Sequence, residues 1–169
     1  MPVDSYKFLP RLIQEVYETD DRQPDLPIPW TPLSSPLSDC KFGLITSGGL
    51  YHKGVELPFD LEREKEQPTW GDPSFRTIPS NIKQTDVGVS HLHTNTQSVT
   101  EDFNVLLPIQ PFKELVREGR IGSLAENAFS FMGYQGYPPD TSSWRQVYAP
   151  QVAQKLKEQV VDCVFLTQS

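Results

Sequence analysis

The sequence is short of cysteine, of positive charge and of long apolar runs. Its 169 residues include two cysteines, Cys40 and Cys163, too few and too far apart for a disulfide framework or a zinc knuckle. No apolar run reaches the ~18 residues that cross a bilayer, and charged residues among the first twenty exclude a signal peptide. We therefore expect a cytoplasmic protein, not bound to a membrane, with two buried and reduced thiols.

Basic residues are outnumbered, with 15 lysines and arginines against 22 acidic residues and a net charge of -7. Such a surface repels nucleic-acid backbones and anionic membranes, so nucleic acid is excluded as the main partner. The length suits one domain. We predict a single unit over residues 1–169, in which residues 1–36 form a helix and an extended strap and residues 37–169 form the core.

Proline is plentiful, and its 16 copies are unevenly distributed. Five of them fall in residues 24–36, PDLPIPWTPLSSP, which predicts an extended strap because proline removes backbone donors. Before the strap, apolar residues recur at helical spacing and predict a helix over residues 5–18. This helix either packs on the domain or forms part of a partner interface.

Strand and helix patterns alternate through the rest of the chain. Apolar runs predict strands at residues 41–46, 87–91 and 160–167, and Gly119 suits the end of a helix that starts near Pro111. Residues 53–86 are polar and read as a long, anchored loop. The alternation predicts an α/β fold with a three-layer, doubly wound, mostly parallel sheet, Rossmann-like or flavodoxin-like.

The last predicted helix has a recognisable start. Ser143 suits the N-cap, and Gln146 three residues later would complete a capping box. Trp144, Val152 and Leu156 belong to its apolar stripe, and Pro150 should break or kink it.

A glycine bend, Ser47-Gly48-Gly49, follows the first predicted strand. Its N–H groups could face a substrate anion or carboxylate, or the glycines could simply form a turn. The chain carries no nucleotide signature, because neither the G-x-G-x-x-G pattern nor a phosphate-loop lysine is present. Both interpretations of the bend stay open.

Histidines supply the sharpest candidate site. His91 and His93 would project from one face of a continuing strand, and His52 would join them at the strand ends, so that a divalent metal or a substrate carboxylate could bind there. Asp102 would complete the ligand set or orient an imidazole. The alternative is that these are ordinary polar residues, although a histidine is the best available proton donor.

Further substrate-binding candidates are Asp72 and Arg76 in GDPSFR, as a clamp, and Ser130 in FSFMGYQGY. A turn residue and a surface cation are the alternative for the first pair. The aromatic and apolar residues of the second stretch either line a pocket or pack beneath the sheet. They are Phe129, Phe131, Met132, Tyr134 and Tyr137.

Several stretches, in order from about residue 28, resemble the selenoprotein B type subunits of glycine, sarcosine, betaine and D-proline reductases. They are IPWTPLSSPLSDCKFGLITSGGLYHKG, FDLEREKEQPTWGDPSFRTIP, SHLHTNTQSVTEDFNVLLPIQPFKELVREGRIGSLAENAFSFMGY and VVDCVFLT. The resemblance implies reductive cleavage of a carbon–nitrogen bond in a small amine or amino-acid substrate. It also implies attack by a selenolate or thiolate, electrons from dithiols, and a protein partner subunit or a homo-oligomer.

The chain departs from the family at its nucleophile. The expected selenocysteine or cysteine cluster after VFLT is missing, since Gln168-Ser169 end the sequence, and Cys163 lies within a strand where burial would blunt its reactivity. Either a UGA codon was read as a stop, or the protein is a binding or scaffolding subunit or a histidine-centred enzyme of other chemistry. Cys163 remains a weak candidate for the nucleophile.

Overall fold

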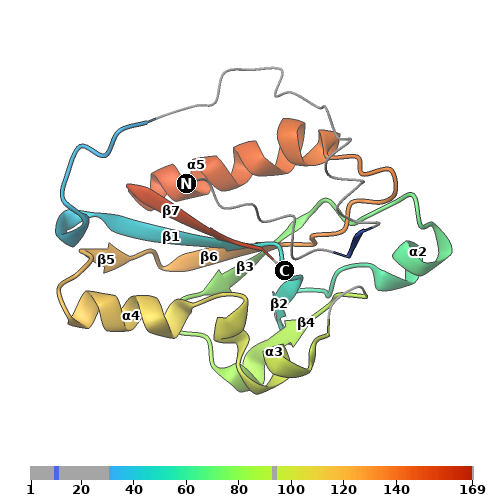
Figure 1. Ribbon diagram of the computed structural model, residues 1–169, viewed down its shortest axis with the longest axis horizontal. Helices are drawn as coiled ribbons and strands as arrows, with labels where there is room; N and C mark the ends of the chain where they lie inside the picture. Colours follow the sequence, from blue (N-terminus) through green and yellow to red (C-terminus); the bar gives the residue numbers. More distant parts are fainter. Residues whose placement is uncertain (1–9, 12–30, 93–94, 169) are drawn as a thin grey trace. The chain divides into compact units, whose positions relative to one another are not determined.

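The computed structural model describes residues 10–11, 31–92 and 95–168 (Figure 1). The chain divides into two units, Met1–Pro32 and Leu33–Ser169, and the description below concerns the second. All but two residues of the helix predicted over 5–18, and most of the strap over 24–36, lie outside the described residues. The single domain over 1–169 stays a prediction.

Strand β1 (Lys41–Thr46) is the centre of a five-stranded mixed sheet. On one side it pairs in parallel with β7 (Cys163–Thr167). On the other side β5 (Ser123–Leu124) pairs with its first half and β6 (Asn127–Phe131) with its second, both in parallel. Strand β3 (Phe75–Pro79) lies antiparallel to β6 at the far edge.

Helices cover both faces of β1, whose side chains alternate between them. Phe42 points to α4 (Ile109–Arg117), where the Phe42 and Phe112 ring centroids lie 5.6 Å apart. Gly43 points to α5 (Ala149–Glu158), and a Cβ there would stand 2.7 Å from the Leu156 side chain. The absent side chain therefore lets α5 approach the sheet closely.

A second, two-stranded sheet joins β2 (Leu50–His52) antiparallel to β4 (Val87–Val89). The strand predicted over 87–91 is therefore confirmed in outline, although it pairs outside the main sheet. Short helices α2 (Leu61–Glu66) and α3 (Gln97–Glu101) and three 3₁₀ turns complete this part of the chain. The turns span Leu37–Asp39, Gln84–Asp86 and Phe103–Val105.

The long loop predicted over 53–86 is wrong, because the segment holds α2 and β3. The polar residues around β3 gave no strand pattern in the sequence. In the structure β3 is an edge strand that pairs with β6 alone among the described residues, and a polar side chain bonds its other edge. Main-chain N–H of Thr77 donates to both carboxylate oxygens of Glu56, at 3.0 and 3.1 Å.

The last helix begins differently from the prediction. Residues Trp144–Tyr148 form a π-helical turn, and Ser143 makes no side-chain cap bond, so the predicted capping box is wrong. Pro150 instead stands in the first turn of α5, at the break that its position predicted. After α5, Val160 takes a positive φ of 54° and turns the chain into β7.

The α/β class is confirmed, with a sheet that is parallel except for β3. The finer three-layer, doubly wound, flavodoxin-like arrangement is not confirmed. Within the described residues, no helix combines the length and apolar character that crossing a membrane requires.

Candidate functional site

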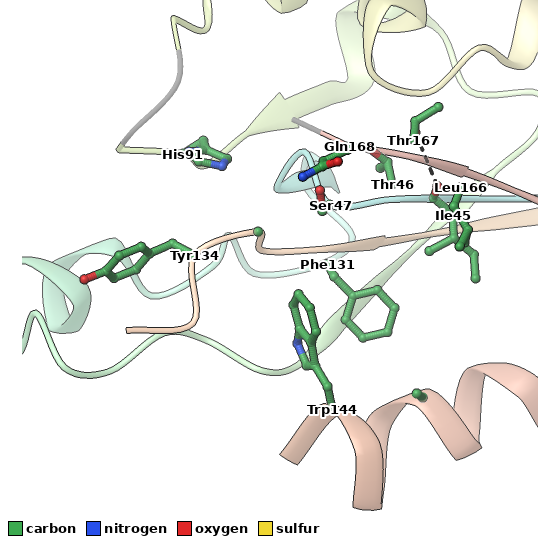
Figure 2. Close-up of a pocket in the computed structure, with 12 residues that line it drawn as sticks. Ile45, Thr46, Ser47, His91, Phe131, Tyr134, Trp144, Leu166, Thr167 and Gln168 are labelled. Atoms are coloured by element: carbon green, nitrogen blue, oxygen red, sulfur yellow. Dashed lines mark hydrogen bonds between the residues drawn. The ribbon is translucent and has the colours of Figure 1, made fainter. Parts of the chain in front are cut away.

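A cavity of about 800 Å³ opens where β1, β6 and β7 end (Figure 2). These are the carboxyl ends of three mutually parallel strands, where α/β sheets collect ligands. The segment after β4 and the π-helical turn supply the remaining walls. The lining residues are Ile45, Thr46, Ser47, His91, Phe131, Gly133, Tyr134, Trp144, Ala149, Leu166, Thr167 and Gln168.

Of the glycine bend that was predicted to bind substrate, Ser47 lines the cavity and Gly48 and Gly49 do not, and the N–H groups of the bend are used within the protein. Ser47 N–H donates to the Thr167 carbonyl at 3.0 Å, and Gly49 N–H donates to the Phe131 carbonyl at 2.9 Å. Gly48 N–H donates to the Thr46 hydroxyl at 3.1 Å. These bonds fix the bend to β6 and β7, and the Ser47 side chain lines the cavity.

Gly49 also ties the bend to the histidine segment. Its carbonyl accepts the Ser90 N–H at 2.8 Å, and its φ is 66°. A Cβ at this position would overlap the Ser90 carbonyl, so only glycine fits both the conformation and the contact. This junction places His91 at the same cavity as Ser47, as the sequence predicted for the bend and one of the paired histidines.

One wall of the cavity is aromatic. The Phe131 and Trp144 rings meet edge to face with centroids 5.5 Å apart, and Figure 2 shows the two side by side. Trp144 Nε1 is buried and makes no hydrogen bond within the described residues. Tyr134 turns its hydroxyl toward the Pro68 carbonyl, to which it donates. Of the five predicted pocket residues, Phe131 and Tyr134 line the cavity.

The polar side chains of the lining are those of Thr46, Ser47, His91, Tyr134, Trp144, Thr167 and Gln168. Thr167 is committed to the fold, because its hydroxyl bonds the carbonyls of Ile45 and Leu106 at 3.3 and 2.5 Å. The lining residues include no aspartate, glutamate, lysine or arginine. The cavity therefore suits a small ligand with an apolar body and one polar end.

The remaining metal candidates lie elsewhere or outside the description. His52 is on β2 and does not line the cavity, and His93 lies outside the described residues. Asp102 is exposed and caps the turn that follows it by accepting the Asn104 N–H at 2.9 Å. No group of three metal-ligating side chains occurs in the described part of the chain. The histidine metal site stays a prediction.

Asp72 and Arg76 form a buried ion pair with an Oδ2 to Nη2 distance of 3.4 Å. Asp72 also accepts from the Ser74 and Asp60 N–H groups. Arg76 donates to the carbonyls of Leu57 and Pro58, and its guanidinium carbon lies 4.1 Å from the Phe59 ring centroid. These bonds hold residues 57–60 against β3, and neither side chain lines the cavity.

Ser130 and Cys163 are also placed by the fold. Ser130 is fully buried, and its hydroxyl accepts the Leu50 N–H at 2.8 Å. Cys163 starts β7, so about four residue steps of ~3.3 Å separate it from the cavity end of the strand. Burial raises the pKa of its thiol, and the neighbouring Cys40 thiol adds to the effect. The expectation of two buried thiols holds for Cys40, whereas Cys163 is partly exposed.

Sequence reasoning did not select Trp144, Leu166, Thr167 or Gln168 as site residues. The signal was available in part, since the strand predicted over 160–167 ends at Thr167 and leads into Gln168. Trp144 is predicted in a helical apolar stripe; it packs against the core cluster that contains Val152 and Leu156, and it also lines the cavity.

Residues 7–169 match the family model for the Glycine/sarcosine/betaine reductase selenoprotein B. The chain belongs to this family. It is 36% identical over 138 residues to the D-proline reductase subunit gamma of Acetoanaerobium sticklandii, which is 82% of this chain and 52% of that protein. It is 27% identical over 158 residues to the Glycine reductase complex component B subunit gamma of Symbiobacterium thermophilum.

The second match covers 93% of this chain and 35% of that relative. The chain therefore spans about half or less of the length of the curated relatives that it matches. No solved structure matches it. Both relatives are reductase subunits, so the family expected from the sequence is confirmed.

Proposed function

We propose that the protein is a reductase subunit that binds a small amine or amino acid for reductive cleavage of its carbon–nitrogen bond, together with a partner subunit. The observation that carries this function is the cavity at the ends of β1, β6 and β7 in a chain of the selenoprotein B family. In such a cleavage a carbon–hydrogen bond replaces the carbon–nitrogen bond: a dithiol gives two electrons and two protons and becomes a disulfide, and one proton goes to the carbon and the other to the leaving nitrogen.

The cavity suits the substrate half of this reaction. Trp144 and Phe131 offer apolar and π surfaces to the carbon skeleton and to a cationic nitrogen. His91 is the one imidazole among the described lining residues, so we assign it the proton for the leaving nitrogen. Ser47 and Gln168 would orient the polar end of the substrate.

The attacking nucleophile is expected from outside the cavity lining. Cys40 and Cys163 are the two cysteines of the chain, and neither lines the cavity. A raised pKa also lowers the thiolate fraction of Cys163 at neutral pH. We therefore assign the nucleophile to neither Cys40 nor Cys163.

Titration calorimetry of the full chain with D-proline, sarcosine and glycine betaine tests this function. Saturable binding of one of them, lost in Trp144→Ala and retained in Trp70→Ala, is expected. No binding of any of the three by a folded protein would contradict a substrate site here.

A second candidate is a binding or scaffolding subunit without its own catalytic groups. The absence of both thiols from the cavity favours it. Under this alternative the His91→Gln variant would keep full activity in the assembled reductase, whereas the proton-donor role predicts a large loss. We also propose, from the sequence, a cytoplasmic location, a divalent metal at the histidines and a doubly wound order of the sheet.

A further inference from the structure

The two edges of the main sheet differ in how their main-chain groups are bonded. The outer edge of β3 is covered at its centre, since the Glu56 carboxylate accepts the Thr77 N–H. Side-chain coverage of this kind is a common way of blocking an edge strand. The opposite edge is β7, which pairs with β1 alone within the described residues.

The register shows which groups of β7 face outward. In a parallel ladder, alternate residues direct both main-chain groups to the same neighbour. The Thr167 carbonyl accepts from Ser47, the residue that follows β1, so Cys163 and Phe165 also face β1. The N–H and C=O groups of Val164 and Leu166 therefore point away from the sheet.

The same two residues also expose apolar side chains. Val164 is 44% exposed and Leu166 70% exposed, and β7 carries no charged residue. The nearest carboxylate, Asp162, is engaged, because its Oδ2 accepts the Lys41 N–H at 2.8 Å. An uncharged edge strand with free donors and acceptors is a template for pairing.

We propose that β7 pairs antiparallel with β7 of a second copy of this chain and joins two sheets into one. The outward groups lie at Val164 and Leu166, symmetrically about Phe165. A two-fold axis at Phe165 brings Val164 of one copy opposite Leu166 of the other, and closed two-fold dimers are the commonest oligomers. The same register sets Asp162 opposite Gln168, so no like charges face each other.

This dimer also bears on the cavity. Leu166 lines the cavity, and its exposed side would pack against Val164 of the second copy. The second copy thus covers the outer side of the wall that β7 contributes. The pairing is independent of the proposed chemistry, because it rests on the strand edge alone.

Sedimentation velocity of the full chain over a range of concentrations tests the dimer. A dimer is expected, and Val164→Lys should weaken it by about tenfold or more, since a lysine on an edge strand opposes pairing. Val55→Lys is the matched control: Val55 is 70% exposed but lies outside the sheets, so the dimer should persist. Circular dichroism confirms that each variant is folded.

Hydrogen exchange gives a second measurement that does not need a variant. Amides of Val164 and Leu166 should become protected as the protein concentration rises, whereas the Phe165 amide should be protected at every concentration. Three results would each overturn this pairing. They are a protein that stays monomeric up to its solubility limit, a dimer that Val164→Lys leaves unaffected, and amide exchange at Val164 and Leu166 that does not depend on protein concentration.

Discussion

The carbonyl oxygen of Gly49 accepts the backbone N–H of Ser90 at 2.8 Å, which joins the end of β1 to the end of β4. This bond sets Ser47 and His91 at one cavity, although 44 positions separate them along the chain. It answers why two glycines follow β1. Gly49 allows the close approach of its backbone to Ser90, and the N–H groups of Gly48 and Gly49 bond the Thr46 hydroxyl and the Phe131 carbonyl.

Replacing Gly49 with alanine should destabilise the fold strongly. The positive φ disfavours alanine, and its Cβ would overlap the Ser90 carbonyl, so we expect a loss of about 2–4 kcal/mol in the free energy of unfolding. Urea denaturation measures it. Gly54→Ala is the control, since Gly54 has a φ of 75° and no atom within 4 Å of its Cβ position, and about 1 kcal/mol is expected there. Equal losses of stability in Gly49→Ala and Gly54→Ala would show that the contact with the Ser90 carbonyl is not the cause.

Amine binding should depend on His91 and not on His52. His91→Gln removes a titratable group from the lining, and we expect the affinity for the best-bound amine to fall about tenfold, as loss of one charged hydrogen bond does. His52→Gln changes a histidine outside the cavity and should leave the affinity unchanged. Calorimetry compares the amine affinities of the two variants. A larger loss of affinity in His52→Gln than in His91→Gln would place the site near β2.

Asp72→Asn should reduce stability and leave ligand binding intact. The substitution leaves the Arg76 guanidinium without its buried partner, and we expect a loss of about 2–4 kcal/mol in the free energy of unfolding. Urea denaturation and calorimetry on the same preparation separate the two effects. Unchanged stability together with loss of amine binding would instead support the predicted role of Asp72 and Arg76 as a substrate clamp.

The Cys163 thiol should react slowly below pH 9. Burial raises its pKa above the ordinary 9.0, so the thiolate fraction at pH 8 is smaller than that of a free cysteine. The Cys40→Ser variant isolates this thiol, and its alkylation rate should rise with a midpoint at or above 9.0. Because the folded protein favours the protonated thiol, the associated stability is present below pH 9 and is lost as pH rises through the folded pKa. A midpoint below 8 would contradict the burial.

Val160→Gly should stabilise the protein. Val160 has a φ of 54°, and its N–H bonds the Lys157 carbonyl while Val161 N–H bonds the Leu156 carbonyl, which is the Schellman pattern that usually carries glycine. The side chain is 69% exposed, so little packing is lost. We expect a gain of about 0.5–1 kcal/mol in the free energy of unfolding. A loss would indicate that Val160 packs in solution.

The predictable parts of the fold were those with an unmixed pattern. Strands β1 and β7 fall in the predicted apolar runs, and α4 ends at Arg117 with Gly119 two residues beyond it, where a φ of 67° suits the predicted position after a helix. Strand β6 was not predicted, because NAFSF lies next to a stretch rich in glycine and aromatic residues, whose pattern is equally typical of a loop that packs beneath the sheet. It pairs with β3 along all five residues and with β1 at Phe129 and Ser130.

The candidate site was predictable only as far as strand ends could be located. Ser47 and His91 were found because each follows a strand that the apolar pattern reveals. Trp144 was not, because the helical pattern predicts its packing against the core but not that the same ring also lines a cavity. The roles predicted for Asp72, Arg76 and Ser130 stay predictions: these residues do not line the cavity and make bonds within the fold, and buried polar groups of either role look alike in sequence.

The cavity walls come from four separate stretches of chain, near residues 46, 91, 132 and 167, with Trp144 between the last two. No short fragment contains them all. Ligand affinity should therefore follow the cooperative unfolding curve of the whole unit, so that occupancy vanishes in one step as denaturant rises. The ability to bind thus serves as a direct reporter of whether the entire sheet is assembled.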